Sequence, residues 1–158
     1  GSEMCIRDSF DQMREREGEK LAEDVRNRAS VIETLVGEVE KRSPERVAEY
    51  REKLLARMRE VLESTDIDET RIVTEAAIYA DKTAVDEETV RLRSHLHQLD
   101  GMLNEVKPVG RKLDFLVQEM NREANTIGSK ANDVEMAQTV VNIKSEIEKI
   151  REQIQNIE

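Results

Sequence analysis

An apolar residue recurs at alternating steps of four and three along the C-terminal segment 136–158. This spacing lines one side of an α-helix with an a/d seam, which needs a partner helix to cover it. The partner can be internal or can belong to another subunit. Aromatic residues make up only 3% of the chain and offer little for a globular core, so the seam favours self-association. It comprises Met136, Val140, Ile143, Ile147, Ile150, Ile154 and Ile157.

The same helical period runs through most of the remaining chain. Two prolines and six glycines in 158 residues leave few points at which helices must stop. We therefore predict an all-α fold of elongated helical hairpins or a bundle, with a long C-terminal heptad helix. Helices are expected over residues 10–41, 44–63, 68–80, 86–106, 110–128 and 132–158, with a break at Ser43-Pro44, a C-terminal cap at Gly128, and Asp68 or Thr70, Asp86 and Asn132 at helix starts.

Three regions follow from this pattern. Residues 1–9 do not match what comes after them: Gly-Ser is a common cloning scar, and the rest resembles translated adapter sequence. They are set aside as non-native, together with Cys5. Residues 10–85 are expected to form a helical arm of long helices, and residues 86–158 a C-terminal helical domain.

Charge and composition exclude several classes of function. The net charge of -10 makes the chain as a whole repel nucleic acid and anionic membranes. We expect no membrane partner and no DNA partner. No apolar stretch is long enough to span a bilayer, and a single cysteine cannot form an internal disulfide. A cytoplasmic location is the default expectation. The segment 107–130 is an exception in charge, because five basic side chains against three acidic ones give it a net charge of +2.

The segment Gly110–Lys130 carries unusual chemistry on its polar side. Glu119 and Glu123 lie one helical turn apart, and like charges at that spacing repel each other unless a cation intervenes. Carboxylates are ligands for Mg²⁺ and Mn²⁺. Asp114 lies on the other flank and would join the same ion only through a neighbouring helix or subunit. The alternative is that both glutamates pair with nearby basic side chains on a solvated surface.

Basic and amide side chains on the same segment suit phosphate binding. Their alternative role is ion pairing with the three acids. Phe115 is able to stack on a base or to pack on a neighbouring helix. His95 lies one turn after Arg91 and is a candidate for proton transfer, as a general acid or base, or for metal binding. The alternative is a surface or interface histidine. The candidates for RNA contact are Arg111, Lys112, Arg122, Asn125 and Lys130.

Long segments of the chain resemble the C-terminal part of the YicC/YloC family of bacterial endoribonucleases. They are GRKLDFLVQEMNREANTIGSKAND, the terminal IKSEIEKIREQIQNIE, REREGEKL at 14–21 and DEETVRLRSHLHQ at 86–98. The resemblance implies RNA cleavage that depends on Mn²⁺ or Mg²⁺, by a ring-like homohexamer in the bacterial cytoplasm. Asp114, Glu119 and Glu123 match the family motif and His95 matches its upstream part, but the resemblance does not assign their individual roles. Our hypothesis is that Glu119, Glu123 and His95 are catalytic and that Asp114, Glu119 and Glu123 are metal ligands.

Members of that family carry a further N-terminal α/β domain. We therefore expect this chain to be a C-terminal fragment that keeps the scaffold and part of the chemistry, and that is inactive alone if the site is shared between the two halves. The alternative function is a non-catalytic helical module for oligomerisation or RNA interaction.

Overall fold

The computed structural model describes residues 2–62, 66–105 and 110–157, and these ranges contain helices and no strand. This confirms the predicted all-α fold. The helices are α1 (Ser2–Leu62), α2 (Glu69–Thr83), α3 (Asp86–Leu103), α4 (Gly110–Lys130) and α5 (Val134–Ile157). In the described part of the chain, none of them combines the length and the apolar character that crossing a membrane requires.

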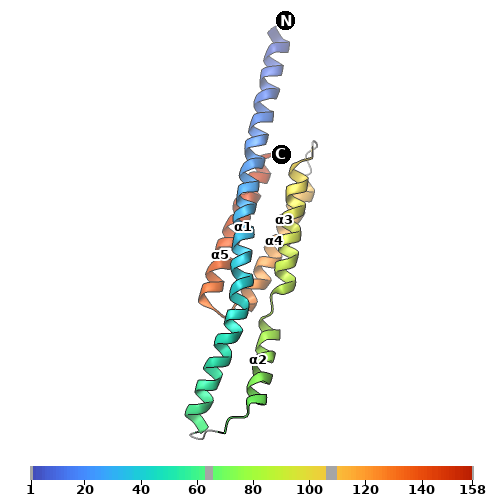
Figure 1. Ribbon diagram of the computed structural model, residues 1–158. Helices are drawn as coiled ribbons and strands as arrows, with labels where there is room; N and C mark the ends of the chain where they lie inside the picture. The colour runs from blue at the N-terminus through green and yellow to red at the C-terminus, as the bar shows by residue number, and fades with distance from the viewer. Residues whose placement is uncertain (1, 63–65, 106–109, 158) are drawn as a thin grey trace.

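Four of the helices form an elongated bundle (Figure 1). Contacts run from α1 to α5, from α5 to α4, from α4 to α3 and from α3 back to α1. The remaining helix, α2, packs on the C-terminal half of α1, and the N-terminal end of α1 extends beyond the bundle. The side chains of residues 5–9 are exposed on that extension, and their non-native origin stays a prediction.

The predicted apolar sides of the helices form the core. The α5 seam is buried inside this chain, from Met136 to Ile154, against α1 and α4. An internal partner therefore covers the seam, and it no longer supports self-association; Ile157 lies outside the described side chains. The other buried core residues include Val25, Ile32, Val36 and Val39 of α1, Leu92, Leu96 and Leu99 of α3, and Leu113, Leu116, Val117, Met120, Ala124 and Ile127 of α4.

The predicted break at Ser43-Pro44 is wrong, because α1 runs through Pro44 without interruption. An internal proline costs about 3 kcal/mol, since it removes one backbone hydrogen bond and crowds the preceding turn. Contacts of Arg42 and Arg46, which lie two residues before and two residues after Pro44, offset this cost. Arg42 donates to Asp133 at 3.0 Å and to Glu49 at 2.7 Å. Arg46, only 3% exposed, donates to the carbonyl oxygens of Thr83 and Lys130, the last residues of α2 and α4.

Three smaller predictions also need correction. Gly128 lies within α4 and not at its cap, and a Cβ there would stand 3.2 Å from Val140 Cγ1. Its role is therefore to let α4 and α5 approach closely. Asp133, rather than Asn132, accepts a 3.0 Å hydrogen bond from the backbone N–H of Met136 and caps α5. Asp86 is the first residue of α3, not its N-cap, whereas the predicted start of α2 at Asp68 is confirmed.

Asp133→Ala is expected to lower the free energy of unfolding by about 1–2 kcal/mol, because α5 loses its N-cap. The hydrogen bond from Arg42 lowers the pKa of Asp133 to about 2. The contribution of this carboxylate is therefore complete above pH 3.8 and disappears as the pH falls toward its folded pKa. Urea unfolding at several pH values, followed by circular dichroism, should show the difference from the unaltered protein shrinking over that range. Asp81→Ala, at an exposed position of α2, is the control, and an equal effect there would contradict the account.

Candidate metal and RNA site

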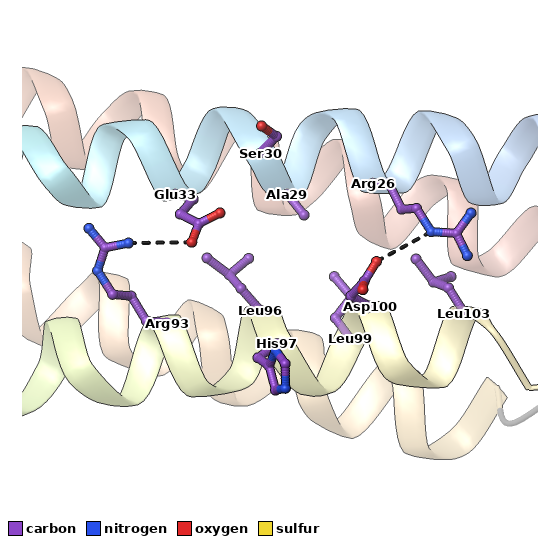
Figure 2. Close-up of a pocket in the computed structure, with 10 residues that line it drawn as sticks. All are labelled: Arg26, Ala29, Ser30, Glu33, Arg93, Leu96, His97, Leu99, Asp100 and Leu103. Carbon is purple, nitrogen blue, oxygen red and sulfur yellow. Dashed lines mark hydrogen bonds and ion pairs between the residues drawn. The ribbon is translucent and has the colours of Figure 1, made fainter.

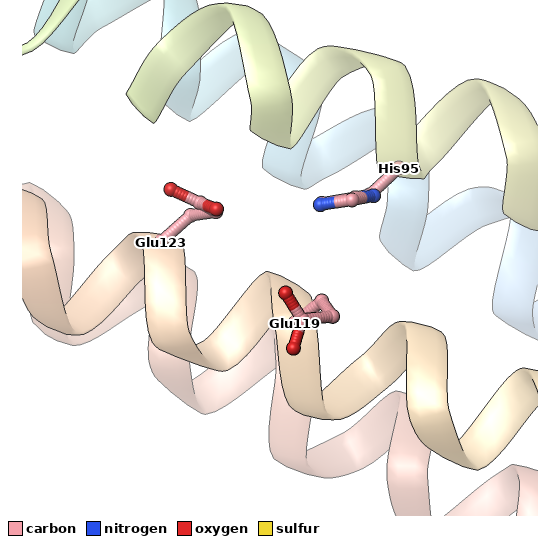
Figure 3. Close-up of side chains that lie close together, drawn as sticks. All are labelled: His95, Glu119 and Glu123. Carbon is pink, nitrogen blue, oxygen red and sulfur yellow. The ribbon is translucent and has the colours of Figure 1, made fainter. Parts of the chain in front are cut away.

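The helices α3 and α4 bring three possible metal ligands together. His95 comes from α3, and Glu119 and Glu123 come from successive turns of α4 (Figure 3). One donor atom from each residue lies within 4.8 Å of the other two. The imidazole of His95 points from α3 into the space beside the two carboxylates. Sequence reasoning named all three residues, but it could not place His95 beside the glutamates.

Glu123 is the least expected member of this cluster, because it is only 5% exposed. Its Oε1 accepts a 3.1 Å hydrogen bond from Nε of Arg91, one turn before His95 on α3. Glu119 has a weaker partner, Arg122 at 3.7 Å, whose side chain is largely solvent-exposed. In the described part of the chain, Nδ1 of His95 is buried and has no hydrogen-bond partner. The cluster thus contains a buried acid and an imidazole whose hydrogen-bonding capacity is not fully used.

This donor set fits a divalent cation. One imidazole nitrogen and two carboxylate oxygens suit Mn²⁺ better than Mg²⁺, which strongly prefers oxygen. Donors that bind one ion at about 2.1 Å can be at most about 4.2 Å apart. Small rotations of the side chains would bring the three groups to that separation.

A chain of ion pairs continues from the cluster to the end of α4. Arg91 lies 3.7 Å from Glu88, and Lys130 donates to Glu88 at 2.8 Å and to the carbonyl oxygen of Ala84 at 3.0 Å. Burial raises the pKa of Glu88 and is the largest single effect, but the hydrogen bonds from Lys130 and from its own backbone N–H, together with the charges of Lys130 and Arg91, outweigh it, so the pKa lies below its usual value. The ammonium of Lys130 therefore serves an internal contact, whereas the sequence suggested a phosphate contact.

The other candidates lie along the outside of α4. Arg111, Lys112, Arg122 and Asn125 are exposed there, as phosphate contact requires. Phe115 is 63% exposed, so the expectation that it packs on a neighbouring helix is wrong within this chain. An open groove on this side is lined by Gln118, Asn121, Arg122, Asn125, Thr126 and Ser129.

Asp114 does not belong to the three-residue cluster. Its Oδ2 accepts a hydrogen bond from Gln118 at 3.3 Å, one turn further along the same helix. A metal-binding role for Asp114 still requires a second helix or subunit, as the sequence suggested.

The opposite side of α3 holds a different kind of hollow. It has a volume of about 210 Å³ and lies between α1 and α3, above an apolar floor of leucines (Figure 2). Ion pairs from Arg26 to Asp100 at 3.3 Å and from Arg93 to Glu33 at 3.5 Å close its edges. These contacts join the two helices. His97 lines this hollow, so it and His95 face different sides of α3.

Two residues of the site escaped a functional assignment from sequence. From the sequence, Arg91 is a neighbour of His95 within the motif that resembles the family, and Glu88 is an acid in the first turn of a helix. The signal was nevertheless present, because Glu88, Arg91 and His95 are spaced by three and four residues and so share one side of a helix. What the spacing could not tell is that this side faces α4 and not solvent.

Comparison with known proteins agrees with the resemblance. Residues 39–158 match the family described as endoribonuclease YicC-like, C-terminal. The chain belongs to this family. It is 52% identical over 148 residues to a protein named probable endoribonuclease YicC from Clostridioides difficile, and 38% identical over 149 residues to one of the same name from Haemophilus influenzae. These alignments cover 93% and 94% of this chain but 50% and 51% of the relatives, so the chain spans about half their length.

Lys130→Gln should destabilise the fold by about 1–3 kcal/mol at pH 7, because the buried carboxylate of Glu88 loses its closest cation. Since the pKa of Glu88 is lowered in the folded protein, its contribution is present above the usual carboxyl pKa and is lost as the pH falls. Urea unfolding should therefore show a smaller difference from the unaltered protein at pH 3 than at pH 7. Lys112→Gln, exposed on the same helix, is the control. Equal stability of both variants would assign Lys130 to the surface and not to the fold.

Proposed function

We propose that this chain holds the divalent cation of a metal-dependent endoribonuclease, with His95, Glu119 and Glu123 as ligands. The observation that carries this proposal is the convergence of these donors from two helices around the buried Glu123. The names of the relatives in the YicC-like family supply the substrate class, RNA. In this assignment His95 is a metal ligand, which takes the place of the general acid or base role expected from the sequence.

The exposed side of α4 would bind the RNA backbone. Arg111, Lys112 and Arg122 supply charge, Asn125 supplies an amide, and Phe115 offers an exposed ring on which a base can stack. Arg122 belongs to both parts of this surface, because it pairs with Glu119 and lines the open groove. A phosphate held by Arg122 would therefore lie beside the carboxylates.

Each residue of the site has a distinct task in this proposal. Glu119 and Glu123 supply negative charge, and α3 and α4 hold them close to His95 before any ligand arrives. A bound Mn²⁺ or Mg²⁺ would polarise the scissile phosphate and activate a water or a ribose oxygen. The arginines would position the RNA so that a phosphodiester bond lies over the ligands.

The assembly and location follow the family resemblance. We include in the proposal a homo-oligomer, hexameric in the full-length family, and a cytoplasmic location in a bacterium. Because the chain spans about half of its relatives, cleavage by this chain alone is part of what the tests below decide. A non-catalytic module for RNA interaction or oligomerisation is the alternative.

Glu119→Gln and Glu123→Gln are each expected to weaken Mn²⁺ binding at least about tenfold, because each removes one charged ligand. Isothermal titration of the chain with Mn²⁺ measures this directly. Metal-dependent cleavage of an end-labelled structured RNA, stopped by EDTA, should fail in the same variants. Asp114→Asn is the matched control and should retain Mn²⁺ binding. Binding by neither the variants nor the unaltered chain would favour the non-catalytic alternative.

Arg111→Gln and Arg122→Gln should each weaken RNA binding, measured in EDTA so that no cleavage occurs. Each should also reduce the slope of log affinity against log salt concentration by about 0.7, as expected for one lost contact to a single-stranded phosphate backbone. Lys144→Gln, at an exposed position of α5, removes the same charge away from α4. An unchanged slope in the two α4 variants would exclude this helix as the RNA-binding surface.

A further inference from the structure

Arg91 occupies the place of a positive charge in the candidate metal site. Its Nε lies 3.1 Å from Oε1 of Glu123, and in the described part of the chain this is the ion pair in which Glu123 takes part. A carboxylate as deeply buried as Glu123 needs a nearby cation or a proton. In the absence of metal, Arg91 supplies that positive charge.

The same contact opposes metal binding. A divalent cation at Glu123 would stand within a few ångströms of the Arg91 guanidinium, and the two positive charges would repel each other strongly in a partly buried setting. The Nε donor of Arg91 also occupies one of the oxygens that the site offers. Glu123 therefore has to exchange its arginine partner for the metal.

The structure holds an acceptor for the displaced guanidinium. Oε2 of Glu88 is buried and has no hydrogen-bond partner in the described part of the chain. Nη2 of Arg91 already lies 3.7 Å from the other oxygen of Glu88, and Nη1 lies 3.6 Å from Glu87. Both contacts are longer than a hydrogen bond and can shorten. The Arg91 side chain is 49% exposed, so it has room to move.

We propose that Arg91 is a resident counter-ion of the metal site, which moves from Glu123 toward Glu88 and Glu87 when a divalent cation binds. This inference rests on the proposed metal site and deepens it. The summed charge of the groups around the site is small both without and with the metal. Four carboxylates against three basic groups leave a net charge of -1 without metal, and a divalent cation changes this to +1. These groups are Glu87, Glu88, Glu119 and Glu123, with Arg91, Arg122 and Lys130.

The two possible roles of Arg91, counter-ion or positioning residue, predict opposite changes in Mn²⁺ affinity when its charge is removed. If Arg91 competes with the metal, Arg91→Gln should bind Mn²⁺ on the order of tenfold more tightly, because removing its charge removes repulsion. If Arg91 instead holds Glu123 in place for the metal, the same variant should bind Mn²⁺ more weakly. Isothermal titration with Mn²⁺, in the absence of RNA, measures the sign directly.

Thermal unfolding gives a second readout. In EDTA, Arg91→Gln should melt at a lower temperature than the unaltered protein, because Glu123 is left buried without its partner. Saturating Mn²⁺ should raise the melting temperature more in this variant than in the unaltered protein. Arg93→Gln is the matched control, since it removes the same charge and an ion pair with Glu40 on the other side of α3. It should leave Mn²⁺ affinity unchanged.

Arg91→Lys provides a variant that keeps the charge if Arg91→Gln does not fold. It lacks the Nε contact, and its Mn²⁺ affinity should lie above that of the unaltered protein and below that of Arg91→Gln. Equal or weaker Mn²⁺ binding by the Arg91 variants would overturn the exchange and leave the metal site standing. Absence of Mn²⁺ binding in the unaltered protein would overturn both proposals.

Discussion

The burial of a carboxylate between α3 and α4 is the constraint on which the site depends. Glu123 lies among core residues of α4, where an unpaired negative charge is costly. Arg91 on the opposite helix, α3, offsets this cost and lies 3.1 Å from Glu123. His95 lies one turn further along α3. A site that must neutralise a fixed negative charge favours cations, and this preference makes a metal-binding role consistent with the packing.

The rest of the bundle fixes the distance between these two helices. The α5 seam and the apolar side of α1 are buried against the other helices, and Gly128 lets α5 approach α4 closely. At the far end of α4, Arg46 and Lys130 connect its last turn to α1, to the end of α2 and to Glu88. Side chains held by rigid helices keep their geometry without a ligand, which is what a preorganised site requires. Stability and the proposed metal binding therefore depend on the same contacts.

Sequence periodicity predicted which side of each helix is apolar, because that pattern reflects local geometry alone. It located the buried side of α4 and placed Glu119 and Glu123 one helical turn apart. It failed where a contact from a distant segment decides the outcome. Pro44 remains helical because Arg42 and Arg46 bind distant segments of the chain. The α5 seam packs against other helices of the same chain. Glu123 is buried because Arg91 approaches from α3. None of these pairings leaves a periodic signal in the sequence.

Anomalous diffraction from crystals soaked in Mn²⁺ tests the central claim most directly. The account predicts one strong peak among His95, Glu119 and Glu123, at about 2.2 Å from their donor atoms. It also predicts that the guanidinium of Arg91 lies farther from Glu123 than the 3.1 Å of the present structure. A fully occupied Mn²⁺ peak elsewhere on the chain, with this cluster empty and Arg91 still bound to Glu123, would contradict the account.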